Sequence, residues 1–280
     1  MKLYKSAPLP FVGQKRMFAT HYIKVLEQYP DSATFVDLFG GSGLLSHITK
    51  RIKPNARVIY NDFDNYRQRL TNIPQTNKLL ADLRQMVGDS VPRHKPIKGE
   101  LEERIYERIA EEERQQGYVD YITLSSSLLF SMKYKTDLKG MRKETLWNVI
   151  RKTDYPPCDD YLQGLEVVSK DYRELYEEFK DDPSVVFLVD PPYLSTDVCT
   201  YKMYWNMTDY LDVLNVLRER PFVYFTSNKS NIIELCDWMG RNRNLGNPFE
   251  SCEKIEFNAT MNYSSTYTDI MLYKALDSAA

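Results

Sequence analysis

Residues 34–64 place the strongest constraint on the fold. They begin with the short apolar run TFVDLF (34–39), whose β-branched start is typical of a strand, and continue through the glycine turn GGSG (40–43). LLSHITKRI (44–52) then has helical spacing, and ARVIYNDFD (56–64) reads as a second strand that ends in acids. A strand, a tight turn, a helix and a second strand form a βαβ unit, which predicts a parallel sheet.

The same alternation returns late in the chain, after a long interruption. Two apolar strands are predicted at 184–190 and 221–228, with a helix at 207–220 between them, and the tail predicts two further strands. Between about residue 75 and residue 165 the αβ rhythm stops, and 100–117 reads as a charged helix. The sequence therefore predicts an α/β main domain formed by residues 1–75 and 165–280. Residues 76–164 are predicted to form an inserted, mostly helical subdomain.

Composition excludes several classes of protein. No apolar run approaches the roughly 20 residues of a membrane span, and the N-terminus lacks the apolar core of a signal peptide. The four cysteines are scattered, without C-x-x-C spacing, which argues against a structural zinc site and is consistent with a reducing cytoplasm. The net charge is −2, so any nucleic-acid-binding surface must be local.

The glycine turn (40–43) lies where a ligand could bind, between a strand and a helix. Glycines let the backbone approach a ligand, and a helix N-terminus offers unpaired N–H groups. The spacing departs from G-x-G-x-x-G, and no Lys-Ser/Thr pair follows, so the dinucleotide fingerprint and the phosphate-binding P-loop both fit poorly. A purely structural turn remains the alternative. Asp37 adds an acid three residues earlier, where the amine of a ligand could sit.

Asp62 follows the second predicted strand, about 20 residues after the glycine turn. An acid at that position can accept hydrogen bonds from both ribose hydroxyls of a nucleoside cofactor. The alternatives are a solvated acid at a strand end or a helix N-cap, and Asp64 competes for the same role.

The segment FLVDPPYL (187–194) ends a buried strand abruptly, because proline cannot continue a sheet ladder. Asp190 would offer an acceptor, Pro191 and Pro192 would hold the backbone rigid, and Tyr193 would offer a flat face for stacking. An exocyclic base amine is a poor nucleophile because its lone pair is delocalised into the ring. A carboxylate and a carbonyl that hold both amine hydrogens would aim that lone pair at an electrophile. A Pro-Pro turn with a surface tyrosine is the alternative.

Four segments of the chain resemble one family. DPPY (190–193) and FVDLFGGSG (35–43) look like motifs of amino-group DNA methyltransferases. PLPFVGQKRMF (8–18) and SKDYREL (169–175) are similar to two further motifs of the Dam-like adenine-specific subgroup. In that subgroup the target-recognition insertion also lies between the glycine motif and DPPY. The inserted segment itself shows no clear match.

The resemblance implies a Rossmann-like methyltransferase fold, S-adenosyl-L-methionine as cofactor and a division of labour among the motifs. Lys15 would lie near the cofactor carboxylate, although Gly13-Gln14 replaces the family's usual glycine pair before this lysine. The other implied cofactor-binding residues are Asp37, Phe39, Gly40, Gly43, Asp62, Asp171, Tyr172 and Asp190. Catalysis on the target base would fall to Asp190, Pro191, Pro192 and Tyr193. No metal is implied.

A base inside a duplex has to be flipped out before its amine can enter such a pocket, and this costs a few kcal/mol. A basic stretch of the insertion is the candidate for gripping the DNA backbone. Its predicted DNA-binding residues are Lys133, Lys135, Lys139, Arg142 and Lys143. The alternative is a solvated face whose charge is balanced by the acidic segment 100–114.

The leading expectation is an enzyme that methylates the exocyclic N6 of adenine in a specific sequence of double-stranded DNA. A restriction endonuclease is a possible partner, and the sequence does not define the recognition site or the oligomeric state. The alternatives are an N4-cytosine DNA methyltransferase, an adenine RNA methyltransferase, or a non-catalytic nucleic-acid-binding protein of the same fold.

Overall fold

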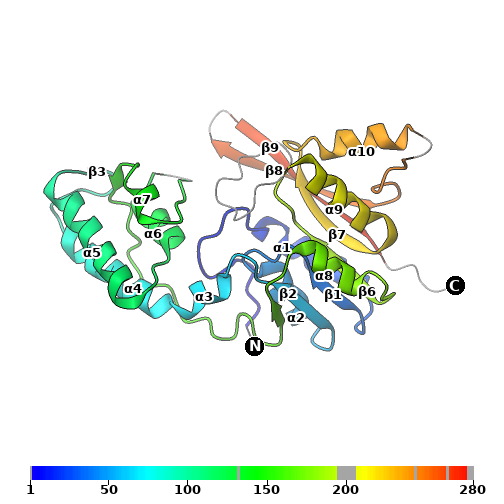
Figure 1. The fold of residues 1–280 in the computed structure, drawn as a ribbon, viewed down its shortest axis with the longest axis horizontal. Coiled ribbons are helices and arrows are strands. Elements are labelled where there is room, and N and C mark those ends of the chain that lie inside the picture. The colour runs from blue at the N-terminus through cyan, green and yellow to red at the C-terminus, as the bar shows by residue number, and fades with distance from the viewer. Residues whose placement is uncertain (1, 131–132, 194–205, 243–244, 263–264, 276–280) are drawn as a thin grey trace. The chain divides into compact units, whose positions relative to one another are not determined.

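The computed structural model describes residues 2–130, 133–193, 206–242, 245–262 and 265–275 (Figure 1). The chain divides into two compact units. The first, called the sheet unit here, comprises Met1–Ala7, Gly13–Tyr66 and Asp160–Ala280. The second, called the helical unit, comprises Pro8–Val12 and Arg67–Asp159.

The sheet unit is built on a seven-stranded sheet. In spatial order the strands are β5 (Glu166–Val168), β2 (Arg57–Asn61), β1 (Thr34–Asp37), β6 (Val185–Val189), β7 (Phe222–Ser227), β9 (Ser265–Lys274) and β8 (Glu253–Asn262). The first five are parallel, and β9 runs antiparallel to both β7 and β8. From β1 the chain moves outward to β2 and β5, then returns to the other side of β1 as β6. In open α/β sheets, ligands bind at the carboxyl ends of the strands beside such a reversal of strand order.

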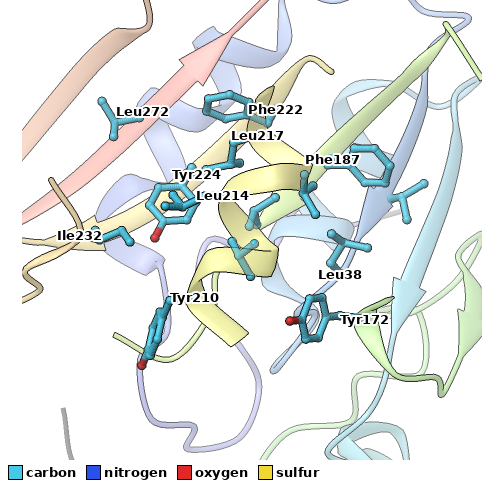
Figure 2. Close-up of a cluster of buried hydrophobic side chains, with 14 of the residues drawn as sticks. Leu38, Tyr172, Phe187, Tyr210, Leu214, Leu217, Phe222, Tyr224, Ile232 and Leu272 are labelled. Carbon is cyan, nitrogen blue, oxygen red and sulfur yellow. The ribbon is translucent and has the colours of Figure 1, made fainter. Parts of the chain in front are cut away.

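Helices cover both faces of this sheet. On one face lie α8 (Tyr172–Phe179), α9 (Met207–Glu219) and α10 (Ile232–Gly240), and the opposite face carries α1 (Ala19–Leu26) and α2 (Leu44–Ile52). The side chains of strand β6 are apolar on both faces of the sheet, so both faces need a cover. Val185, Phe187 and Val189 pack toward α8, α9 and α10, whereas Val186 and Leu188 pack toward α1 and α2. Figure 2 shows the first cluster, where Phe187 lies among side chains from α8, α9 and β7. The predicted α/β fold with a mainly parallel sheet is confirmed.

The helical unit is mostly helix, as the sequence predicts. Its elements are α3 (Tyr66–Thr71, whose first residue belongs to the sheet unit), α4 (Ile73–Val87), β3 (Pro96–Ile97), α5 (Glu100–Gln116), α6 (Tyr121–Leu128), α7 (Leu138–Met141) and β4 (Leu146–Trp147). A buried ion pair joins Arg69 to Asp120 at 3.0 Å, and Asp120 also caps α6 by accepting the N–H of Thr123. Arg69 donates to the carbonyl of Pro10 at 2.7 Å, which ties the short N-terminal segment of this unit to it.

The sheet-unit helices predicted at 44–52 and 207–220 correspond to α2 and α9, and the charged helix predicted at 100–117 corresponds to α5. Among the described residues, no helix is long and apolar enough to cross a membrane. The functional roles of 1–75 with 165–280 and of 76–164 remain proposals.

Candidate active site

Two carboxylates stand at neighbouring strand ends beside the reversal of strand order. Asp37 is the last residue of β1 and pairs in register with Leu188 of β6, and Asp190 follows two residues after Leu188. Asp37 is fully buried, and Ser46 donates its hydroxyl to Oδ2 at 2.6 Å. No described residue makes a hydrogen bond to Oδ1. Burial raises the pKa of Asp37 to about 7, with Ser46 opposing the rise and Asp190 adding to it.

The glycine turn is shaped by close packing as well as by backbone conformation. A Cβ at Gly40 would lie 2.7 Å from the carbonyl oxygen of Asn61 and against the ring of Tyr60. Gly43 has φ of 70°, a left-handed conformation, at the position that precedes α2. Tyr60 donates its hydroxyl to the carbonyl of Gly41 at 2.8 Å. The structural explanation of these glycines therefore holds, and the turn also lies directly after Asp37.

Asp62 lies one residue beyond β2 and is buried. Its Oδ1 accepts the N–H of Tyr66 at 2.5 Å and the hydroxyl of Tyr60 at 3.1 Å. Tyr66 is the first residue of α3, so Asp62 accepts a hydrogen bond from the N-terminus of a helix, as the capping alternative expects. The ribose-binding role that the resemblance implies stays a prediction.

Asp190 forms an ion pair with Lys15. The two atoms Lys15 Nζ and Asp190 Oδ2 are 2.6 Å apart, and both side chains are largely buried, with 9% and 18% of their surface exposed. Lys15 also donates to the carbonyl of Gly13 at 2.7 Å. Burial raises the pKa of Asp190, and the ammonium of Lys15 opposes that rise. The structure thus pairs Lys15 with the acid of the DPPY segment, and its predicted contact with the cofactor carboxylate stays a prediction.

The rest of the DPPY segment continues from that ion pair. Pro191 and Pro192 are buried, and the ring of Tyr193 is partly exposed, with Lys15 Nζ 5.5 Å from its centroid. A rigid Pro-Pro backbone holds its neighbours in place because proline fixes φ. Leu194, the last residue of the strand-end segment singled out above, lies outside the described residues.

Asp171 and Tyr172 stand at the start of α8. Asp171 caps this helix by accepting the N–H of Arg173 at 2.8 Å. Tyr172 is buried, its ring packs against Phe39 with the centroids 5.0 Å apart, and its hydroxyl donates to the carbonyl of Asp209 at 3.2 Å. The structure brings Phe39 and Tyr172 together, whereas the cofactor contact that the resemblance implies for both stays a prediction.

Comparisons with known proteins give the family of the chain. The sequence model of D12 class N6 adenine-specific DNA methyltransferases matches residues 11–220. This chain belongs to that family. It is also 37% identical over 280 residues to a Haemophilus influenzae protein named "Putative methyltransferase", across 98% of this chain and 93% of that relative. The expectation of an adenine-specific DNA methyltransferase is therefore confirmed.

A DNA methyltransferase acts on DNA, so the charges of the helical unit become relevant. Three of the five predicted DNA-binding residues make ion pairs with acids of that unit: Lys133 and Lys135 with Glu144, and Arg142 with Glu103. Lys139 and Lys143 are exposed, and no ion pair joins either to another described residue. The acidic segment 100–114 thus balances the charge of Arg142, as the alternative interpretation expects. A DNA contact stays a prediction for all five residues.

Sequence reasoning missed two residues of this candidate site. Asn61 donates its amide to the carbonyls of Leu38 and Lys170, both at 3.0 Å, and so fixes the turn after β1 against the segment after β5. Asp269 lies in β9 opposite Ser227, the last residue of β7. Its charge acts on both Asp190 and Lys15. An asparagine or aspartate alone carries no sequence signal for either role.

Proposed function

We propose that this adenine-specific DNA methyltransferase uses S-adenosyl-L-methionine, holds it beside Asp37, and transfers its methyl group to an adenine flipped out of double-stranded DNA against Asp190. The observation that supports this proposal is the adjacency of these two acids at the carboxyl ends of β1 and β6, where the strand order reverses. Ligands of doubly wound sheets bind at that edge.

The residues around Asp37 fit the cofactor. Oδ1 of Asp37 is a buried acceptor without a hydrogen bond from the described residues, and a buried polar atom of this kind is costly unless a ligand satisfies it. The ammonium group of the cofactor is a suitable donor. Gly40 packs so closely on Tyr60 and Asn61 that no side chain fits there, and this packing holds the turn directly after Asp37. S-adenosyl-L-methionine would supply an electrophilic methyl group on a sulfonium.

Asp190 and the carbonyl of Pro191 would hold the two hydrogens of the adenine amine. With both hydrogens held, the lone pair of the nitrogen points out of the base plane toward the methyl group. Tyr193 would stack on the base and fix its plane. Positioning and charge stabilisation then supply the rate enhancement, and direct transfer requires no covalent enzyme intermediate. The proton leaves after transfer, because methylation makes the nitrogen far more acidic.

The helical unit would carry target recognition, with Lys139 and Lys143 as the first phosphate contacts because their charges are not engaged by described acids. Lys133, Lys135 and Arg142 would have to leave their carboxylate partners to contact phosphates. A partner restriction endonuclease remains an expectation from the family resemblance.

Transfer of labelled methyl from S-adenosyl-L-methionine to three substrates tests the proposal: unmethylated duplex DNA, single-stranded DNA and RNA. We expect label on duplex DNA with wild-type protein and at least about a hundredfold less with Asp190→Ala, because the amine loses its acceptor. Thermal melting followed by circular dichroism shows that the variant is folded. Transfer to RNA alone, or equal transfer by the two proteins, would contradict the proposal.

A further inference from the structure

Lys15 occupies an unusual position for a lysine. Its stem is buried, and its ammonium reaches Oδ2 of Asp190 at 2.6 Å and the carbonyl of Gly13 at 2.7 Å. The rings of Tyr193 and Phe225 have their centroids 5.5 Å and 6.0 Å from Nζ. Taking a lysine and an aspartate out of water is costly, so their pairing needs close geometry to be stable. The two aromatic faces add to the stabilisation of the cation.

The ion pair divides the two oxygens of Asp190. Oδ2 is engaged by Lys15, so Oδ1 is the oxygen that remains for a hydrogen of the target amine. A neutral carboxylic acid would be a poor acceptor for that amine, since a carboxylate accepts charge-assisted hydrogen bonds and a protonated acid carries its own hydrogen.

We propose that Lys15 is a positioning residue of the target-base pocket, which holds Asp190 in place and in its ionised form for the amine. This inference rests on the proposed function and assigns Lys15 differently from the family resemblance, which implies the cofactor carboxylate. Lys15 acts through Asp190, so its removal changes the methylation step and leaves cofactor affinity nearly intact.

Asp269 and Lys15 have opposite effects on the pKa of Asp190. The carboxylate of Asp269 raises that pKa, whereas Lys15 lowers it. Burial raises the pKa of Asp269 itself, and Lys15 and then Lys229 oppose that rise. Lys15 thus acts on both Asp190 and Asp269, and Lys229 acts on Asp269. Among the described residues, this cluster also interacts electrostatically with Asp37, Tyr224 and Tyr267, and Tyr193 interacts with Tyr224.

Removal of the two partners should therefore move the titration of Asp190 in opposite directions. Without Lys15 the raising effect of burial is unopposed, so Asp190 protonates at a higher pH and activity is lost earlier on acidification. Without Asp269 a like charge is gone, so Asp190 stays ionised to a lower pH. If Lys15 were only structural, its removal would lower stability but would move neither the titration of Asp190 nor the pH dependence of activity.

The test uses full-length wild-type protein and the variants Lys15→Gln, Lys15→Arg and Asp269→Asn, with Lys24→Gln as an exposed lysine control from α1. Three quantities are measured: the cofactor Kd, the single-turnover rate of methyl transfer as a function of pH, and the titration of Asp190 by NMR of its labelled carboxyl carbon. Thermal melting identifies variants that fail to fold. The NMR titration does not depend on methyl transfer, so it tests the inference even where the proposed function fails.

For Lys15→Gln we expect the rate at neutral pH to fall about tenfold or more, because Asp190 loses the contact that fixes its position for the amine. Its acid limb and the NMR midpoint of Asp190 should both move to higher pH, with the cofactor Kd changed less than about threefold. Asp269→Asn should move both to lower pH. Lys15→Arg should restore most of the wild-type curve, and Lys24→Gln should match wild type. A cofactor Kd weakened more than about tenfold in Lys15→Gln, with the Asp190 midpoint unmoved, would overturn the inference.

Discussion

Lys15 Nζ lies 2.6 Å from Asp190 Oδ2, and this ion pair joins the N-terminal motif to the DPPY motif. The two residues come from opposite ends of the family match, which covers residues 11–220. The contact gives the lysine an acid partner at the predicted catalytic position, on the edge of the sheet where the strand order reverses.

Cofactor binding should weaken on acidification because of Asp37. Burial raises the pKa of this acid to about 7, so it takes up a proton as the pH falls below neutral. A bound ammonium favours the ionised form, and the cofactor Kd should therefore rise by up to about tenfold per pH unit below pH 7. Calorimetry between pH 7 and pH 5.5 measures this slope. The slope should vanish in Asp37→Asn, and an unchanged slope in that variant would assign the effect to another group.

Gly40→Ala should damage both stability and cofactor binding. The new Cβ would meet the carbonyl of Asn61 and the ring of Tyr60, and overpacking of this kind costs about 1–3 kcal/mol. Denaturant unfolding and calorimetry check the two effects. Gly117→Ala is the matched control: it adds a Cβ in open space at a positive φ in the helical unit. It should cost about 1 kcal/mol from backbone strain and leave the cofactor Kd unchanged.

The strand framework and the position of Asp190 were predictable because both depend on local patterns. Apolar β-branched runs separated by a glycine turn predict β1 and β2, and a proline pair must end β6. The ion pair of Lys15 was not predictable, because it depends on how distant segments pack. The ion pairs of Glu144 with Lys133 and Lys135 were not predictable for the same reason. They neutralise part of the basic stretch, which the sequence alone does not show.

His47 should make the stability of the sheet unit depend on pH. Its Nε2 accepts the N–H of Tyr4 at 3.0 Å, so the proton lies on Nδ1, which donates to the carbonyl of Tyr161 at 2.6 Å. Burial lowers the pKa of His47 below its usual value. The stabilisation is therefore complete above about pH 6.5 and is lost as the pH falls through the folded-state pKa.

Unfolding in denaturant at several pH values between 5 and 8 measures that dependence. Compared with wild type, His47→Gln should be less stable at pH 8 and should lose less stability on acidification, because the titrating group is gone. His94→Gln is a suitable control, since His94 is exposed and belongs to the helical unit. If the free energy of unfolding depended on pH equally in wild type and His47→Gln, His47 would be excluded as the source of that dependence.

The lysines of the helical unit should differ in their contribution to DNA binding. Lys139→Gln and Lys143→Gln should each reduce the slope of log K against log salt by about 0.9, the value for one phosphate contact. Lys135→Gln should reduce it less, because Lys135 pairs with Glu144 at 2.9 Å. Fluorescence anisotropy with duplex DNA at four salt concentrations provides the slopes. Equal losses in all three variants would mean that the ion pair opens on binding.

The most direct test of the account is the identity of the methylated nucleoside. Duplex DNA is incubated with S-adenosyl-L-methionine that carries a deuterated methyl group, digested to nucleosides and analysed by mass spectrometry, with wild-type protein and Asp190→Asn in parallel. The account predicts deuteromethyl at N6 of deoxyadenosine with wild type and at least about a hundredfold less with Asp190→Asn, because the amide cannot replace the charged acceptor. Deuteromethyl on N4 of deoxycytidine, or undiminished N6 methylation by Asp190→Asn, would contradict it.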